Sequence, residues 1–149
     1  MNKEELKIHQ LVVLTTSRCN LDCHHCPYSV TNKKINEIDE NEITEESIEF
    51  MLAQLDTNFN RKFSSVLIHG PGEPLLKWKE ISYLLKRANS QENKSLEKDV
   101  NFIVMTNSLF LANENIFKEL SQYKNLQFAL NFVGCSKAQI EKAPLSELF

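Results

Sequence analysis

The apolar residues of this chain fall into four short runs that are separated by longer polar stretches. The runs cover 10–15, 65–69, 100–106 and 126–133, and their β-branched and bulky residues are typical of buried strands. In the last run, large residues alternate with small or polar ones, so one face of that strand is bulky and the other is small or polar. The pattern therefore predicts four strands.

Between these runs, apolar residues recur at intervals of three and four, as they do on one face of a helix. Thr44 and Asn113 precede two of these segments and suit helix N-caps, because their side-chain oxygens accept hydrogen bonds from free backbone N–H groups. A short fourth helix is expected after Ser136. The apolar positions of the first three helices are Ile48, Met51, Leu52 and Leu55; Trp78, Ile81, Leu85 and Ala88; and Ile116, Phe117 and Leu120.

Three polar stretches, 27–41, 56–62 and 90–99, show neither periodicity and are predicted to be a surface loop, a connector and a second loop. Strands that alternate with helices predict βαβ units with right-handed crossovers and a parallel sheet. The expected fold is therefore α/β, with a parallel sheet of about four βα units that forms half a barrel or a small open sheet.

Composition narrows the class of protein. The chain has 149 residues, of which 42% are hydrophobic, so residues 1–149 are expected to form one domain with its own core. The net charge is −3, which gives no basic field that favours nucleic acid or an anionic membrane. Residues 1–7 lack the apolar core of a signal peptide, and no window is apolar enough to span a bilayer. We therefore expect a cytoplasmic protein with no membrane or nucleic-acid partner.

The densest chemical signal is the segment 19–26, Cys-Asn-Leu-Asp-Cys-His-His-Cys, which follows the first predicted strand and holds three of the four cysteines. In a reducing compartment, clustered cysteines bind metal or act in catalysis more often than they form disulfides. Closely spaced thiolates can hold an iron–sulfur cluster. Three thiolates leave the fourth iron of a cube open to a small molecule, by the logic of the open position in a catalytic zinc site. Loops after the carboxyl ends of parallel strands are also where ligands bind in α/β folds.

The cysteines have two other interpretations. A structural zinc site needs a fourth ligand, which only His24, His25 or the distant Cys135 could supply. A redox dithiol could use the C-x-x-C pair Cys23 and Cys26, but the first cysteine of the segment would then have no role.

A second motif, Gly-Pro-Gly-Glu-Pro at residues 70–74, follows the second predicted strand. Glycines allow unusual dihedral angles and close approach of the backbone to a ligand, prolines stiffen the turn, and a carboxylate complements a cation. The other interpretation is an ordinary strand-to-helix turn with a solvated glutamate.

The spacing C-x3-C-x2-C after a strand, followed by this turn, resembles the radical S-adenosylmethionine (SAM) superfamily over almost the whole chain. The resemblance implies that three thiolates ligate a [4Fe–4S] cluster whose fourth iron takes SAM. It also implies that the turn grips the ammonium group of SAM through backbone carbonyls and an acidic side chain. The implied cluster ligands are Cys19, Cys23 and Cys26, and the implied SAM-binding residues are Gly70, Pro71, Gly72, Glu73 and Pro74, with Pro71 replacing the usual second residue of the family segment.

The resemblance also implies a reaction. An electron delivered by a flavodoxin- or ferredoxin-like donor cleaves SAM to methionine and a 5′-deoxyadenosyl radical, which abstracts hydrogen from a substrate. The sequence identifies no residue that would act as an acid or a base on the substrate. It leaves the substrate open, with a peptide or protein as our working guess.

Three further residues are weaker candidates for cofactor contact. Asn107 lies in Thr106-Asn107-Ser108, which resembles the family's Thr-Asn-Gly segment with serine in place of glycine. His25 fills a place that is often aromatic and packed near adenine, and Asn131 lies where the family often has a polar residue near the ribose or carboxylate of SAM. The other interpretations are polar residues that satisfy strand-end backbone groups, and a surface histidine.

The family core has six βα units, whereas this chain is predicted to have four, so residues 1–149 resemble its N-terminal portion. One interpretation is a radical SAM protein that a second chain or a homodimer completes. The other is a cluster-binding fragment without catalysis. Because the strand at 126–133 is expected to be an apolar, unpaired edge, it favours association.

Overall fold

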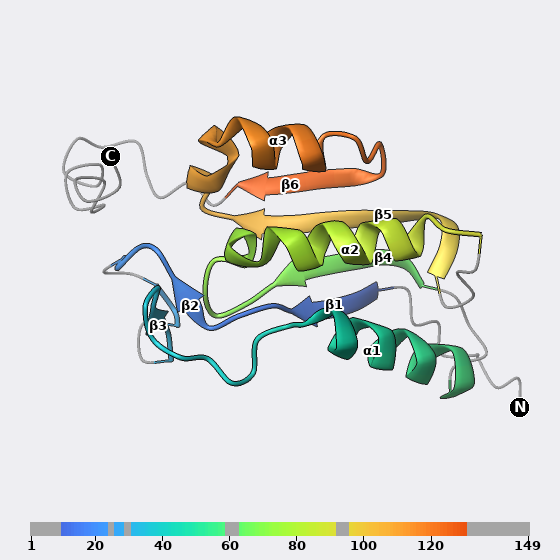
Figure 1. Ribbon diagram of the computed structural model, residues 1–149, viewed down its shortest axis with the longest axis horizontal. Coiled ribbons are helices and arrows are strands. Elements are labelled where there is room, and N and C mark those ends of the chain that lie inside the picture. The colour runs from blue at the N-terminus through green and yellow to red at the C-terminus, as the bar shows by residue number, and fades with distance from the viewer. Residues whose placement is uncertain (1–9, 24–25, 29–30, 59–62, 92–95, 131–149) are drawn as a thin grey trace, which may run out of the picture.

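The structure of the protein is a computed structural model that describes residues 10–23, 26–28, 31–58, 63–91 and 96–130. Strands and helices alternate along the described chain (Figure 1). The elements in order are β1 (Gln10–Leu14), β2 (Arg18–Cys19), β3 (Lys33–Lys34), α1 (Glu45–Asn58), β4 (Phe63–His69), the 3-10 helix η1 (Pro74–Lys77), α2 (Trp78–Ala88), β5 (Leu96–Thr106), the 3-10 helix η2 (Leu109–Ala112), α3 (Glu114–Leu120) and β6 (Leu126–Leu130).

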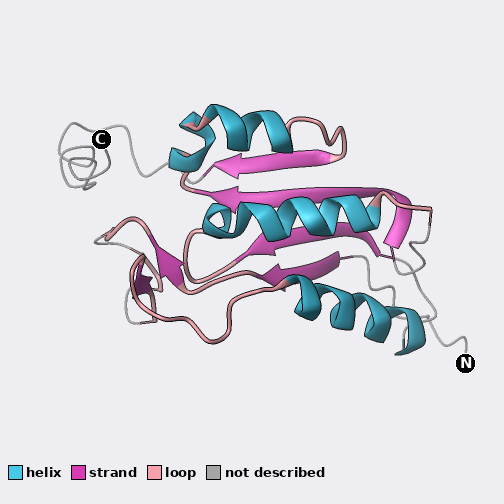
Figure 2. Ribbon diagram, in the orientation of Figure 1, coloured by secondary structure: helices cyan, strands magenta, loops and turns pink. Residues whose placement is uncertain are grey.

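The main sheet contains β1, β4, β5 and β6 in that order, and every neighbouring pair is parallel. Each connection between these strands contains a helix, and α1, α2 and α3 lie on the same side of the sheet (Figure 2). This arrangement repeats a βα unit with one handedness of crossover. The predicted α/β class with a parallel sheet is therefore confirmed.

The two faces of the sheet are buried to different extents. Val66 and Ile68 of β4 and Val104 of β5 are fully buried against the helices. On the opposite face, the side chains of Val12 and Leu14 in β1 are 51% and 62% exposed. Alternate strand residues point to opposite faces, so this difference follows from the pleat. No helix within the described residues covers the second face.

The predicted helix starts are correct. The backbone N–H of Ser47 donates to Oγ1 of Thr44 at 3.1 Å, and the N–H of Thr44 donates back to Oγ of Ser47 at 2.8 Å. Oδ1 of Asn113 accepts from the backbone N–H of Asn115 and of Ile116. These side chains satisfy donors that the first turn of a helix leaves free.

Three predicted boundaries are wrong. Helix α1 continues to Asn58, into the expected connector at 56–62. Strand β5 begins at Leu96, inside the expected loop at 90–99, because Leu96 is buried and pairs with Phe63 across an irregular register. Charged residues lie on the exposed side of the first part of this strand, so the composition of the segment resembles that of a loop.

The third error concerns the long loop at 27–41. It contains β3, which pairs in parallel with β2 through Arg18 with Lys33 and Cys19 with Lys34. A strand of two residues has no periodicity, so nothing in the local sequence predicts it. The pairing joins the middle of this loop to the segment that carries Cys19.

The described part of the predicted last strand is β6, at one edge of the sheet. Leu126 and Phe128 pack against the core and Gln127 is exposed, as the alternation predicts, whereas Leu130, predicted on the same face, is 56% exposed. The expected continuation to 133 and the expected helix after Ser136 lie outside the described residues. No helix in the described ranges has the length and apolarity that crossing a membrane requires.

Candidate functional site

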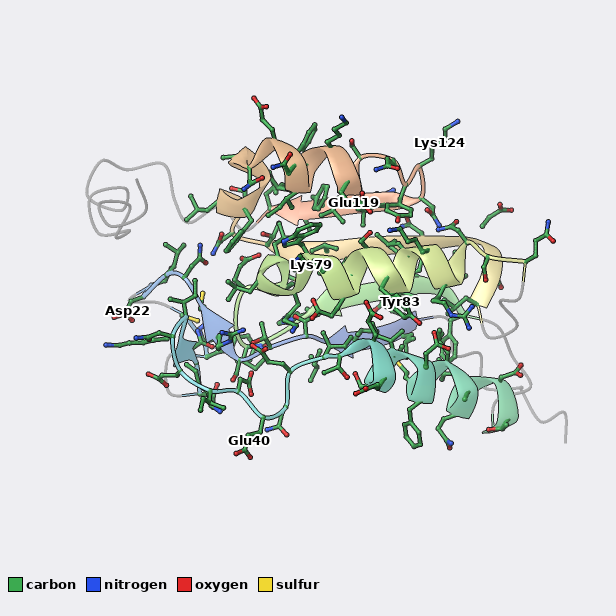
Figure 3. All side chains as sticks on the ribbon, viewed as in Figure 1. Asp22, Glu40, Lys79, Tyr83, Glu119 and Lys124 are labelled. Carbon is green, nitrogen blue, oxygen red and sulfur yellow. The ribbon has the colours of Figure 1, made fainter. Side chains whose placement is uncertain are left out.

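The predicted motifs meet at the carboxyl end of the sheet. The cysteine segment follows β1, the turn at 70–74 follows β4, and Asn107 follows β5. Asp22, inside the cysteine segment, lies at the end to which the strand arrows point (Figure 3). Parallel α/β sheets place their ligand sites at this end.

A cavity of about 440 Å³ opens between these loops. This volume is in the usual range for sites that bind small molecules. Its wall contains the three predicted cluster ligands and most of the predicted SAM-binding turn. The lining residues are Cys19, Leu21, Cys23, Cys26, Pro27, Tyr28, Asn32, His69, Gly70, Pro71, Gly72, Glu73, Met105, Thr106 and Asn107.

Among the described residues, one predicted SAM-binding residue, Pro74, is not part of this wall. Pro74 is buried and begins the 3-10 helix η1, so its role in the structure is to start that helix. His25 and Asn131 lie outside the described residues. Their predicted contacts with SAM stay predictions.

The turn at 70–74 is joined to the cysteine loop by backbone hydrogen bonds. The N–H of Gly72 donates to the carbonyl of Thr16 at 3.0 Å, and the N–H of Glu73 donates to the carbonyl of Arg18 at 2.8 Å. A Cβ atom on Gly72 would lie 2.0 Å from the carbonyl oxygen of Arg18. A Cβ atom on Gly70 would lie 2.6 Å from the carbonyl oxygen of Thr16. The structure therefore gives both glycines a role in loop-to-loop packing, where the sequence suggested close approach to a ligand.

Glu73 is buried, with 2% of its surface exposed, and its carboxylate accepts three hydrogen bonds. Oε1 accepts from the N–H of Leu75 at 3.0 Å and from Oγ1 of Thr106 at 2.6 Å, and Oε2 accepts from the N–H of Asn107 at 2.8 Å. Burial raises the pKa of Glu73, and these hydrogen bonds oppose that rise. The carboxylate thus connects the start of η1 with the end of β5, while its residue lines the cavity.

Asn107 connects β5 to the cysteine loop. Its Nδ2 donates to Oδ1 of Asn20 at 2.8 Å, and its Oδ1 accepts from the N–H of Leu109 at 3.1 Å. Such contacts at the end of a strand are what the alternative interpretation of Asn107 expects, in which a polar residue satisfies strand-end groups. The next residue, Ser108, has φ of 71°, a left-handed conformation that favours glycine. This explains physically why the similar family segment has glycine there.

Asp39 holds the beginning of the cysteine loop. Its Oδ2 accepts from the N–H of Ser17 at 2.6 Å, from Oγ of Ser17 at 2.8 Å and from Oγ1 of Thr16 at 3.1 Å. Burial alone would raise the pKa of Asp39, but these bonds and one from the N–H of Asn41 outweigh it and hold that pKa well below its usual range. Asp39 is therefore an ionised anchor for residues that precede Cys19.

Glu42 is a second anchor. It accepts hydrogen bonds from Nε of Arg18, from Oγ1 of Thr16 at 2.8 Å and from Nζ of Lys77 at 3.4 Å. Its pKa is lowered because these partners together outweigh the effect of burial. The sequence analysis missed Arg18, Asp39 and Glu42. Their one local signal is charge in segments without a helix or strand pattern, which is indistinguishable from a solvated surface.

The three cysteines face a common space. No disulfide joins them, and each is partly buried. Burial raises the pKa of Cys19, to which the charges of Glu73, Cys23 and Cys26 add, and burial followed by the charges of Cys26 and Asp22 raises that of Cys23. Electrostatic influence of this kind acts over short distances. Three thiols without a disulfide partner that line one cavity match the donor set of a cluster with one open iron.

Two buried polar atoms in the cavity wall, Nδ1 of His69 and Oδ1 of Asn32, have no hydrogen-bond partner within the described residues. The ring of His69 also contacts the ring of Tyr28 edge-on, with centroids 5.7 Å apart. Buried polar atoms are rarely left without partners in a finished site. The wall therefore fits a polar ligand.

Within the described residues, no three His, Cys, Asp or Glu side chains are grouped as ligands of a single metal ion. A single zinc ion draws its ligands to about 2.0–2.3 Å, whereas a cluster spreads its thiolates over several irons. The candidates for a fourth zinc ligand, His24, His25 and Cys135, lie outside the described residues. Zinc stays an untested alternative.

Comparison with known proteins gives the class. The family model for the radical SAM superfamily matches residues 13–142, so the chain belongs to the radical SAM superfamily. The cofactors of this family are a [4Fe–4S] cluster and SAM, and its enzymes need an electron donor.

A solved structure described as native anSMEcpe with bound AdoMet has a similar fold, with a TM-score of 0.62 and 23% sequence identity. The match covers 92% of this chain and 36% of that chain. This chain thus corresponds to about a third of the length of the solved protein. A search of the curated proteins gives no significant match.

Proposed function

We propose that the chain forms the part of a radical SAM protein that binds the cluster and SAM. Cys19, Cys23 and Cys26 are the proposed cluster ligands, and residues 70–74 form the proposed SAM-binding turn. The observation that supports this most strongly is the single cavity lined by all three thiols and by Gly70 to Glu73.

The bound cofactors supply the chemistry of this proposal, which is reductive cleavage of SAM to a 5′-deoxyadenosyl radical that removes hydrogen from a substrate. The protein holds and orients them. The three thiolates would hold the cluster, and SAM would bind to the iron that they leave open. The backbone of Gly70 and Gly72 and the carboxylate of Glu73 bound the SAM side, where Glu73 complements a cationic group.

The turn and the loop are held rigidly, which suits this role. The hydrogen bonds from Gly72 to Thr16 and from Glu73 to Arg18 fix the SAM-binding turn against the cysteine loop. Fixed geometry between two cofactors saves the entropy of bringing them together.

We further propose that the active form needs more protein than these 149 residues. Support comes from the 36% coverage of the solved chain and from the uncovered face that includes Val12, Leu14 and Met105. A second chain or a homodimer would cover this face. The proposed electron donor is a flavodoxin- or ferredoxin-like protein, the proposed substrate is a peptide or protein, and the proposed compartment is the cytoplasm.

Anaerobic reconstitution with iron and sulfide tests the proposal. The expected product is brown and, when reduced, gives an EPR signal that changes on addition of SAM, with 5′-deoxyadenosine formed. Cys19→Ser, Cys23→Ser and Cys26→Ser are each expected to lose the cluster. Cys135→Ser, the matched control, is expected to keep it.

Other outcomes identify the alternatives. A brown protein without a response to SAM would indicate a cluster-binding fragment that does not catalyse. A colourless protein that holds metal in air would indicate the structural zinc site and overturn the proposal.

A further inference from the structure

One hydrogen bond reaches a proposed cluster ligand from a residue to which no role has been assigned. Nδ2 of Asn32 donates to Sγ of Cys26 at 3.3 Å. Asn32 is also part of the cavity wall. It comes six residues after Cys26, in the stretch that the sequence predicted to be a surface loop.

The backbone on both sides of Asn32 is fixed. Its N–H donates to the carbonyl of Tyr28 at 2.8 Å, in a turn that Thr31 shares. The next residue, Lys33, donates its N–H to the carbonyl of Ser17 at 2.9 Å and begins β3, which pairs with β2. The side chain therefore projects toward Cys26 from backbone that is already tied to the cysteine loop.

The chemistry of the amide decides its orientation when a cluster is bound. A thiolate has no proton to donate, so only the NH2 group of Asn32 can hydrogen-bond to it. Oδ1 is then left buried without a partner among the described residues. A buried acceptor without a partner costs free energy. The donor contact with sulfur is thus kept at a local cost to the other end of the same amide.

Hydrogen bonds to the ligating sulfurs set the reduction potential of iron–sulfur clusters. One-electron reduction puts more negative charge on the cluster and its thiolates, so an N–H donor stabilises the reduced form more than the oxidised form. We propose that Asn32 raises the reduction potential of the cluster through its hydrogen bond to Cys26. This inference rests on the proposed function, because it requires a cluster on Cys26.

Electrons balance in the reduction of the cluster. The cluster gains one electron from a protein electron carrier, which is oxidised by one electron. Asn32 forms no covalent bond and neither gains nor loses a proton. It is a tuning residue that acts through Cys26 and not a catalytic residue.

Asn32→Leu removes the donor at nearly constant shape. The measurement is an anaerobic EPR redox titration of the reconstituted wild-type and variant proteins without SAM. The equilibrium constant for reduction of the variant is expected to fall about tenfold, which for one electron is about 59 mV. Asn32→Asp places an acceptor-only carboxylate beside the thiolate, so the reduction potential of this variant is expected to be lower than that of Asn32→Leu. Thr31→Ala, the control, removes a hydroxyl that donates to the carbonyl of Tyr28 but keeps the backbone hydrogen bonds of the turn and the amide of Asn32, so it should leave the potential unchanged.

The outcomes separate this inference from the proposed function. A wild-type protein that assembles no cluster would overturn both. A normal cluster in Asn32→Leu with the wild-type potential would overturn the tuning role alone. Asn32→Ala is a second donor-free variant, and it should show the same downward shift. If both donor-free variants lose the cluster while Thr31→Ala retains it, Asn32 acts in assembly and the tuning role is wrong.

Discussion

The loop after β1 and the turn after β4 both line one cavity, but the contacts that position them differ. Side chains hold the loop: Asp39 and Glu42, both distant in sequence, bind Thr16, Ser17 and Arg18 near its start. The turn at 70–74 packs against this loop through close backbone contacts, and the carboxylate of Glu73 joins it to the end of β5. Side-chain anchors can be weakened one at a time, whereas a close backbone contact leaves no room for a larger residue. Substitutions in the loop should therefore act by degrees, and those in the turn should be severe.

The turn and the loop also differ in the direction in which their surroundings shift the pKa of a carboxyl group. Burial raises the pKa of Glu73 in the turn, whereas hydrogen bonds hold the pKa of Asp39 in the loop below its usual range. The loop is thus anchored by a carboxylate that stays ionised at neutral pH. The turn contains one whose charge is disfavoured by its surroundings.

The largest effect is expected from Gly72→Ala. The added Cβ would lie 2.0 Å from the carbonyl oxygen of Arg18, so backbone must move and its hydrogen bonds to the loop must break. We expect a loss of more than about 3 kcal/mol in the free energy of unfolding of the cluster-free protein. Urea unfolding followed by circular dichroism measures it. Gly70→Ala, with a contact of 2.6 Å, should cost less. Equal stability of wild type and Gly72→Ala would contradict the backbone contact.

The next effect is that of Glu73→Gln. An amide keeps the shape but replaces one acceptor oxygen with a donor, which then faces the N–H of Asn107 or the N–H and hydroxyl groups of Leu75 and Thr106. The expected cost is about 2–3 kcal/mol of unfolding free energy. Binding of SAM to the reconstituted protein should weaken as well. Glu114→Gln, the same change on the exposed first turn of α3, should alter neither, and an effect of similar size there would remove the special role of the turn.

Asp39→Asn tests the loop. Loss of charge-assisted hydrogen bonds from Ser17 and Thr16 should cost about 1–2 kcal/mol at pH 7. Because the folded-state pKa is depressed, the unfolded chain binds more protons in acid. The stability from Asp39 is thus present above its ordinary pKa of 3.8 and lost as pH falls through the folded value. Urea unfolding at pH 7, 5 and 3 should show the gap between wild type and variant narrowing below pH 3.8. A gap that is constant with pH would disprove the charged anchor.

The smallest effect is a gain in stability. Ser108 has a left-handed φ of 71° and its side chain makes no capping hydrogen bond. Ser108→Gly should raise the free energy of unfolding by about 0.5–1 kcal/mol, because glycine has no Cβ penalty in this conformation. Ser108→Ala keeps the penalty and should give no gain. Thermal unfolding of the three proteins measures the difference, and a gain in Ser108→Ala would contradict the backbone explanation.

Much of the fold followed from local patterns. The spacing of Ile48, Met51 and Leu55 predicted α1, and Thr44 and Asn113 were correct as N-caps. Such signals are local, because a helix or a cap depends on residues within a few positions. The sequence did not predict the short strands β2 and β3, because each is defined by its partner and not by its own sequence.

The candidate site was predicted only in part. The cysteines and the turn could be predicted because reactive residue types occur there at a fixed spacing. Asn32, Asp39 and Glu42 were not, because an amide or carboxylate in a polar loop looks like a solvated residue until its partner is known. The partners of the two acids near the start of the cysteine loop, Thr16, Ser17 and Arg18, are 22 to 26 residues away in the chain.

By itself, the amino-acid sequence determined the order of the helices and of the four strands of the main sheet, with the residue types at their carboxyl ends, because hydrophobic periodicity and motif spacing are properties of neighbouring residues. Only the tertiary structure decided that Gly72 must lack a side chain, that Asp39 anchors the cysteine loop and that Asn32 reaches Cys26. These features depend on distances between separate segments. Those distances are set when the parallel strands align and bring their loops to one end of the sheet.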